Sequence, residues 1–89
     1  MIERELLVTN RLGLHARATA RLVQLLSGYR CDVTLTAKGR EVNAKSIMGV
    51  MLLAAGPGTT VLLQADGPDE IAAVTAAVEL FKRNFDEEG

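Results

Sequence analysis

The sequence predicts a two-layer α+β sandwich, in which helices cover one face of a small sheet. Short apolar or alternating segments and segments of helical period follow one another in the order strand, helix, strand, strand, helix, strand, helix. The chain has 89 residues without an evident linker or repeat, so we expect residues 1–89 to form one domain. Hydrophobic residues make up 48% and aromatic residues 3%, which indicates an aliphatic core. The order of the strands stays open.

The individual elements follow from the spacing of apolar residues. The predicted strands are short apolar or alternating segments, namely residues 2–8, 31–37, 40–43 and 60–65. The predicted helices are residues 16–27, residues 46–53 and a last helix that opens at residues 67–70. The first helix starts at His15 or within one residue of it, and Gly28 suits its C-terminal end.

The last helix is expected to have Pro68 in its first turn, with acidic residues near the positive end of the helix dipole. Lys82 and Arg83 lie near its C-terminal end, where cations are favoured. Its predicted buried stripe consists of Ile71, Val74, Thr75, Val78, Phe81 and Phe85.

Composition and charge exclude several classes of protein. Ten basic and eleven acidic residues give a net charge of −1, and the only aromatic residues are one Tyr and two Phe. Binding to nucleic acid or to an acidic membrane surface is therefore disfavoured. The single cysteine, Cys31, indicates a reducing compartment and is expected to be a small buried residue. Without a signal pattern or the roughly 20 apolar residues of a membrane span, we expect a cytoplasmic protein without membrane insertion.

His15, the only histidine, is the main candidate for chemistry. A helix start offers unpaired N–H groups and a partial positive charge, so we expect the start at Ala16 and Arg17 to bind phosphate. Imidazole is a competent nucleophile for phosphoryl transfer, and the Arg17 guanidinium would add a charged fork. From position alone, the alternatives are a surface histidine that acts as a weak cap and a solvated arginine.

Ser46 opens a second candidate cluster. On pattern alone, a helix N-cap is the favoured interpretation. The functional alternative is a phosphorylation site beside an exposed apolar patch formed by Ile47, Met48 and Met51, because methionine adapts to more than one partner surface. Core packing of these three residues is the other possibility, and the sequence does not separate the two.

Other kinds of site are not supported. One His and one Cys do not make a metal site, and no Gly-rich nucleotide loop is present. A catalytic triad lacks convincing members, since His15 has no obvious paired carboxylate in the sequence. We therefore expect no metal, no cofactor and no enzymatic turnover by this chain itself.

Two segments resemble a known family. Residues 10–17, Asn-Arg-Leu-Gly-Leu-His-Ala-Arg, resemble the active-site segment of the HPr family, the histidine-containing phosphocarriers of the bacterial phosphotransferase system. Residues 43–51, Asn-Ala-Lys-Ser-Ile-Met-Gly-Val-Met, resemble the family's regulatory serine segment. The spacing between the segments, the order of the elements and the length also agree, so the resemblance covers essentially the whole chain.

The resemblance implies an open-faced sandwich with a four-stranded antiparallel sheet covered on one face by three helices. It implies that His15 accepts a phosphoryl group on Nδ1 from phosphoenolpyruvate by way of enzyme I and passes it to an enzyme IIA, with Arg17 stabilising the group. Ser46 would be the target of an ATP-dependent HPr kinase/phosphorylase. The docking patch for enzyme I and the kinase would contain Ile47, Met48 and Met51.

The chain departs from the family at Ala18, where proline is usual. Alanine is a good helix former and returns one N–H to the helix start, so we expect transfer to persist with altered loop stiffness and rate.

Two alternative functions stay open. One is the nitrogen-related phosphocarrier NPr, which the acidic tail at residues 84–88 would suit; the other is a regulatory binding protein controlled by Ser46 with His15 idle. A monomer is expected.

Overall fold

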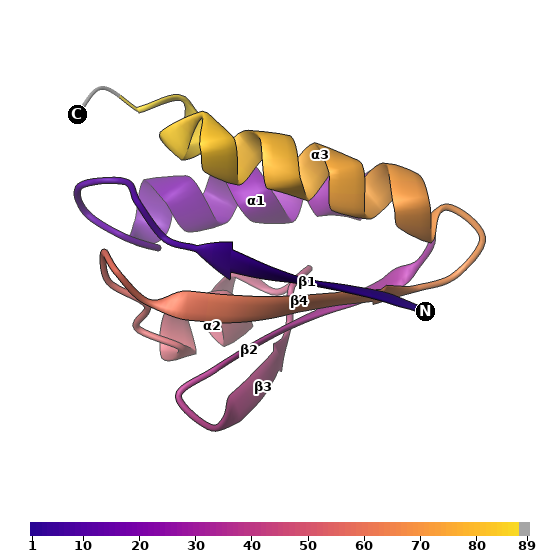
Figure 1. Cartoon of the computed structure of the whole chain (residues 1–89), viewed down its shortest axis with the longest axis horizontal. Coiled ribbons are helices and arrows are strands. Elements are labelled where there is room, and N and C mark those ends of the chain that lie inside the picture. Colours follow the sequence, from indigo (N-terminus) through magenta and orange to yellow (C-terminus); the bar gives the residue numbers. More distant parts are fainter. Residues whose placement is uncertain (88–89) are drawn as a thin grey trace.

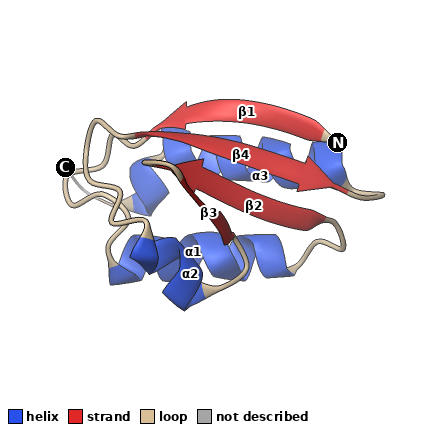
Figure 2. Ribbon diagram, turned by 90° about the horizontal axis from the view of Figure 1, so that it is seen from below, coloured by secondary structure: helices blue, strands red, loops and turns tan. Residues whose placement is uncertain are grey.

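The computed structural model describes residues 1–87 and contains a four-stranded antiparallel sheet with its helices packed on one side (Figures 1 and 2). The strands are β1 (Ile2–Leu7), β2 (Asp32–Ala37), β3 (Arg40–Asn43) and β4 (Thr60–Asp66). The helices are α1 (Ala16–Ser27), α2 (Ile47–Leu52), α3 (Glu70–Lys82) and a short 3-10 turn, η1 (Asn84–Asp86). The element order and the α+β sandwich are confirmed. Every helix in residues 1–87 is too short or too polar to span a bilayer.

The sheet has the strand order β1-β4-β2-β3, so the first strand pairs with the last one. The two central strands, β2 and β4, alternate between buried and less buried residues. Successive side chains of a strand point to opposite faces, which directs one set towards the helices and leaves the other on the open face. The buried set is Val33, Leu35, Ala37, Val61, Leu63 and Ala65.

The core lies between this face and the helices α1 and α3, which run side by side (Figure 1). The buried face of α1 consists of Ala18, Thr19, Leu22, Val23 and Leu26. Fully burying a leucine such as Leu22 or Leu26 contributes about 2 kcal/mol. The core is aliphatic as predicted, apart from Phe81 and Phe85, whose ring centroids are 4.8 Å apart.

The predicted stripe of the last helix is partly wrong, because Ile71 and Thr75 are exposed. The other predicted members are buried or half-buried, and they are Val74, Val78, Phe81 and Phe85. Small residues complete the packed face together with one leucine, namely Ala73, Ala77 and Leu80. Since this helix is apolar around much of its circumference, spacing alone does not identify the side that packs. Phe85 lies beyond the end of α3, in η1.

The start of α3 also differs from the prediction. Pro68 precedes the N-cap residue Asp69 and so lies outside the first turn. The Asp69 carboxylate does not cap its own helix but accepts the backbone N–H groups of Arg30 at 2.7 Å and Cys31 at 2.9 Å. These bonds, the one from Arg30 first, hold the pKa of Asp69 below its usual value. Asp69 therefore ties the start of α3 to the segment that enters β2. Cys31 is buried, as predicted.

The loop before α1 is fixed by a close backbone contact at Gly13. Gly13 has φ +67°, and the next residue, Leu14, donates its N–H to the Ala55 carbonyl at 2.8 Å. A Cβ at Gly13 would lie 2.5 Å from that carbonyl oxygen and 2.7 Å from the Gly56 Cα. Glycine is therefore required here both for its left-handed backbone and for the space. The contact places the residue that precedes α1, His15, relative to the segment after α2.

Two glycine substitutions separate these two requirements. Gly39 has φ +75°, but a Cβ there would meet nothing within 4 Å among the described residues. We expect Gly39→Ala to lower the free energy of unfolding by about 1 kcal/mol, from backbone strain alone. Gly13→Ala should lower it by about 3 kcal/mol, because the collision with Ala55 and Gly56 adds to the same strain. Urea unfolding followed by circular dichroism measures both free energies. Equal losses in the two variants would contradict a steric collision at Gly13.

Candidate functional site

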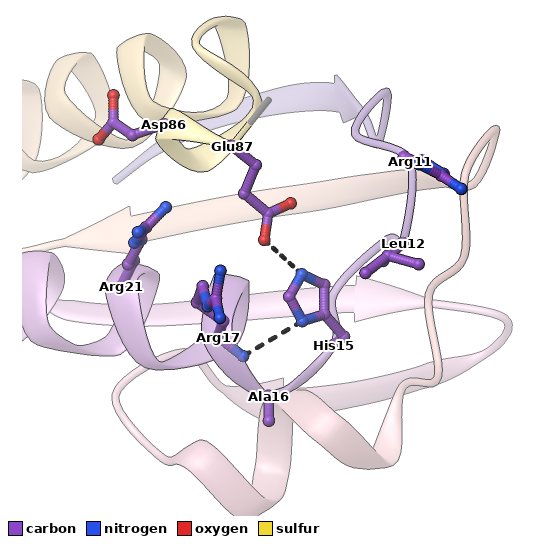
Figure 3. Close-up of a pocket in the computed structure, with 8 residues that line it drawn as sticks. All are labelled: Arg11, Leu12, His15, Ala16, Arg17, Arg21, Asp86 and Glu87. Carbon is purple, nitrogen blue, oxygen red and sulfur yellow. Dashed lines mark hydrogen bonds and ion pairs between the residues drawn. The ribbon is translucent and has the colours of Figure 1, made fainter. Parts of the chain in front are cut away.

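His15 stands in an open surface hollow of about 800 Å³ at the N-terminal end of α1 (Figure 3). Three parts of the chain meet there: the loop before α1, the first turns of α1 and the segment that follows α3. The lining residues are Arg11, Leu12, His15, Ala16, Arg17, Arg21, Asp86 and Glu87. The His15 side chain is 25% exposed, so a partner protein can reach it without any opening of the fold.

The backbone of His15 makes it the N-cap of α1. It is extended, with φ −75° and ψ −179°, and its carbonyl accepts the N–H of Thr19 at 2.9 Å. Its ring Nδ1 accepts the backbone N–H of Arg17 at 3.3 Å, as a cap residue should. The capping role considered from the sequence is therefore real, and it holds Nδ1 beside the N–H groups of the helix start.

The other ring nitrogen of His15, Nε2, contacts the carboxylate of Glu87 (Figure 3). A carboxylate only accepts hydrogen bonds and a backbone N–H only donates them. The ring form that satisfies both neighbours thus has its proton on Nε2 and a lone pair on Nδ1.

Glu87 is only 11% exposed and has a second partner, since its Oε1 accepts the Asn10 side-chain amide at 2.8 Å. Burial by itself would raise the pKa of the Glu87 carboxyl. The hydrogen bonds from Asn10 and His15, with a smaller contribution from the charge of Arg21, outweigh burial and bring this pKa below its usual value of 4.5. Glu87 is therefore a carboxylate at neutral pH.

Residues 84–87, which we call the C-terminal strap, carry Glu87 to this position. Phe85 is buried against Phe81, and its carbonyl accepts a hydrogen bond from the Arg21 guanidinium. At the start of the strap, Thr9 donates its hydroxyl to the Asn84 side chain at 2.5 Å. Residues 84–86 all have left-handed backbones, with φ of 52°, 57° and 60°. Such backbones are unfavourable for residues other than glycine, so these contacts have to offset the strain.

The hollow is suited to an anion. Arg17 and Arg21 lie four residues apart on one face of α1 and flank the ring on one side, while Arg11 lies on the other (Figure 3). The first turn of α1 contains no acidic residue that would compete for the helix start. Within residues 1–87, no three His, Cys, Asp or Glu side chains gather into a group that could hold a metal ion.

Comparisons with known proteins agree with this geometry. Residues 2–83 match the family model described as the PTS HPr component phosphorylation site. Phosphocarrier protein HPr of Xylella fastidiosa (strain 9a5c) is 60% identical over 88 residues, which cover 99% of each chain. The HPr of Cupriavidus necator is 51% identical over 87 residues, or 98% of each chain. The crystal structure of HPr-C-His from Thermoanaerobacter tengcongensis is 40% identical with a TM-score of 0.96, covering 100% of both chains.

The chain belongs to the HPr family. It is a phosphocarrier protein of the phosphotransferase system and a carrier rather than an enzyme. The resemblance seen in residues 10–17 and 43–51 is confirmed over the whole chain. The open-faced sandwich with a four-stranded antiparallel sheet, which that resemblance implied, is confirmed as well.

The hollow brings together three predicted site residues, His15, Ala16 and Arg17, but the residues described as lining it do not include the Ser46 cluster. Ser46 is the N-cap of α2, and its hydroxyl accepts the N–H of Gly49 at 3.1 Å. Core packing of the three apolar residues that follow is excluded, because all are exposed. The exposed fractions are 46% for Ile47, 78% for Met48 and 43% for Met51. We call these three residues the apolar patch.

Sequence reasoning missed several residues of the site. No carboxylate partner of His15 is obvious in the sequence, but the structure supplies one in Glu87, 72 positions away. In the sequence, the acidic tail suits NPr and gives no sign of a contact with His15, and its last member, Glu88, lies outside the described residues. Arg21 could have been predicted from the sequence, because it follows Arg17 by one helical turn. Asn10 is part of the segment at residues 10–17, but nothing in the sequence indicates that its side chain is fully buried.

Ala18, the departure from the usual proline, is the third residue of α1 and is fully buried. Its methyl group therefore packs in the core beneath the site rather than facing the hollow. The expected effect of Ala18 on the rate of transfer stays a prediction.

The lowered pKa of Glu87 predicts a pH-dependent contribution to stability. The folded protein holds this carboxyl ionised more strongly than the unfolded chain, so the contribution is present above pH 4.5 and is lost as the pH falls through the lower, folded pKa. We expect Glu87→Gln to lower the free energy of unfolding by about 1 kcal/mol at pH 7, and this difference from the parent should shrink by pH 3.

Urea unfolding at the two pH values tests this expectation. Glu5→Gln, on the exposed side of β1, is the matched control and should follow the parent at both. A Glu87→Gln deficit that is the same at pH 3 and pH 7 would show that the ionised carboxylate contributes nothing.

Proposed function

We propose that His15 Nδ1 is the atom that carries the phosphoryl group. The observation that supports this most directly is the lone pair on Nδ1, held at a helix start beside Arg17 while Nε2 is occupied by Glu87. Membership of the HPr family implies enzyme I as the donor and an enzyme IIA as the acceptor. The proposed carrier acts in the cytoplasm as a monomer, with residues 1–89 forming one domain.

In the proposed reaction, the Nδ1 lone pair gives up its hydrogen bond from the Arg17 N–H and attacks the phosphorus, and the bond between phosphorus and the donor breaks with its electrons going to the donor. The N–H groups at Ala16 and Arg17 and the Arg17 guanidinium face the charge of the transferred group. Within residues 1–87, the hollow around His15 is open and does not exclude water. The partners must therefore complete the site, which suits a group that has to be received from one protein and delivered to another.

Phosphoryl uptake can be measured by intact mass after incubation with phosphoenolpyruvate, Mg²⁺ and enzyme I. We expect the parent to gain one acid-labile phosphoryl group and His15→Ala to gain none. Circular dichroism of His15→Ala provides the control that the variant is folded. An equal gain in both proteins, or no gain in the parent with an active cognate enzyme I, would exclude His15 as the acceptor.

The proposed regulatory site is Ser46, modified by an ATP-dependent HPr kinase/phosphorylase. Phosphate at this N-cap would not unfold α2, because negative charge is favoured at a helix N-terminus. It would place roughly two negative charges directly before the apolar patch, which we propose as the docking surface for enzyme I and the kinase. Modification would then weaken a partner that prefers this surface uncharged.

Two serine substitutions test this regulation. We expect Ser46→Asp to slow phosphorylation by enzyme I about tenfold or more, because the charge lies beside the apolar patch. Thr75→Asp adds the same charge on the exposed face of α3, a helix that packs on α1 and the sheet, and should leave the rate within about twofold of the parent. A Ser46→Asp rate equal to that of Thr75→Asp would contradict the proposal. Ser46→Ala should in addition abolish ATP-dependent labelling by the kinase.

A further inference from the structure

We propose that Glu87 is a positioning residue for phosphoryl transfer: it holds the His15 ring with its proton on Nε2, and thereby keeps the lone pair of Nδ1 available. This inference rests on His15 being the phosphoryl acceptor. It assigns a function to the C-terminal strap, a segment outside the residues matched to the family model.

The His15 ring is held from both sides, and the two contacts depend on each other. The Arg17 backbone N–H needs an unprotonated Nδ1, and the Glu87 carboxylate needs a proton on Nε2. Loss of the carboxylate would remove the contact that fixes Nε2 as the protonated atom. The ring could then exchange tautomers or rotate away from the helix start, and each change removes the nucleophile.

The hydrogen bonds of Asn10 show that the fold fixes the position of Glu87. The Asn10 amide nitrogen donates to Gly13 at 2.7 Å and to Glu87 at 2.8 Å, which commits both of its hydrogens. The amide oxygen of Asn10 is buried without a hydrogen-bond partner among residues 1–87. A buried unpaired acceptor is unfavourable, so the orientation of Asn10 is maintained by the two hydrogen bonds that its amide nitrogen donates.

The backbone of the C-terminal strap is also held in place by its contacts. Its three left-handed residues are strained, and they are held in place by the buried Phe85 ring and by the Arg21 guanidinium on the Phe85 carbonyl. Asp86 points its carboxylate to Arg83 at 2.8 Å rather than to the ring. Of the two acidic residues that line the hollow, only Glu87 therefore contacts His15.

The contact matters throughout the reaction. When the Nδ1–phosphorus bond forms, the lone pair enters that bond, the proton stays on Nε2 and the ring gains a positive charge. The Glu87 carboxylate faces that charge across the Nε2–H bond. On delivery the Nδ1–phosphorus bond breaks, its electrons return to Nδ1 and the ring is again neutral with its proton on Nε2.

The first test uses the ¹⁵N chemical shifts of the His15 ring in the unphosphorylated protein, which need no donor. At neutral pH we expect the parent to show a protonated Nε2 and a bare Nδ1. In Glu87→Ala both shifts should move towards the average of the two tautomers. Glu87→Gln, whose carbonyl can accept from Nε2–H, should restore much of the parent pattern. Asp86→Asn, in the same strap but not in contact with the ring, should match the parent.

The second test is single-turnover uptake from phosphorylated enzyme I at several concentrations. We expect Glu87→Ala to lower the maximal rate about tenfold with little change in the half-saturating concentration, because Glu87 lies outside the apolar patch. Parent-like ring shifts in Glu87→Ala, or a parent-like maximal rate, would overturn the positioning role, even if stability falls. Failure of the proposed function would give a different result from failure of the positioning role. The parent itself would then take up no phosphoryl group on His15, while the ring shifts would still show whether Glu87 fixes the tautomer.

Discussion

The functional geometry depends first on the close backbone contact at Gly13. Because no side chain intervenes, the loop before α1 bonds directly to Ala55, and the chain leaves that contact at the residue that must cap α1. The capping position fixes the His15 ring with Nδ1 at the helix start. The site therefore needs no deep cavity, which a chain of 89 residues could provide only at the expense of its core. The same openness would let two different proteins reach the proposed acceptor atom, Nδ1, in turn.

The second contact of the His15 ring, at Nε2, comes from the C-terminal strap. The C-terminal strap returns across α1 and places a carboxylate beside His15, the proposed phosphoryl acceptor. Two anions near one ring repel each other, but Glu87 contacts Nε2 whereas Nδ1 lies on the other side of the ring, and Arg17 and Arg21 line the same hollow. In the proposed phosphorylated state the Glu87 carboxylate also faces the positive charge of the ring, so its attraction to the ring opposes its repulsion of the phosphoryl group.

Much of the fold was predictable from local patterns. The limits of α1 were predicted because its polar and apolar faces are distinct, and the sandwich followed from the order of the elements. Ile71 and Thr75 were misplaced because α3 packs through the small side chains of Ala73 and Ala77, which carry little periodic signal. His15 and Arg17 were found because they adjoin a helix start. Glu87 was not, since only the pairing of β1 with β4 and the return of α3 bring the two chain ends together.

The central claim is that His15 carries the phosphoryl group on Nδ1 with the proton retained on Nε2. Two-dimensional ¹H–¹⁵N correlation spectra of the phosphorylated protein, recorded with ³¹P coupling, identify directly which ring nitrogen is bonded to phosphorus. We expect phosphorus on Nδ1 and a proton on Nε2, in slow exchange with water because Glu87 holds it. Phosphorus on Nε2 would contradict the assignment, since it would require the ring to leave both of its present contacts.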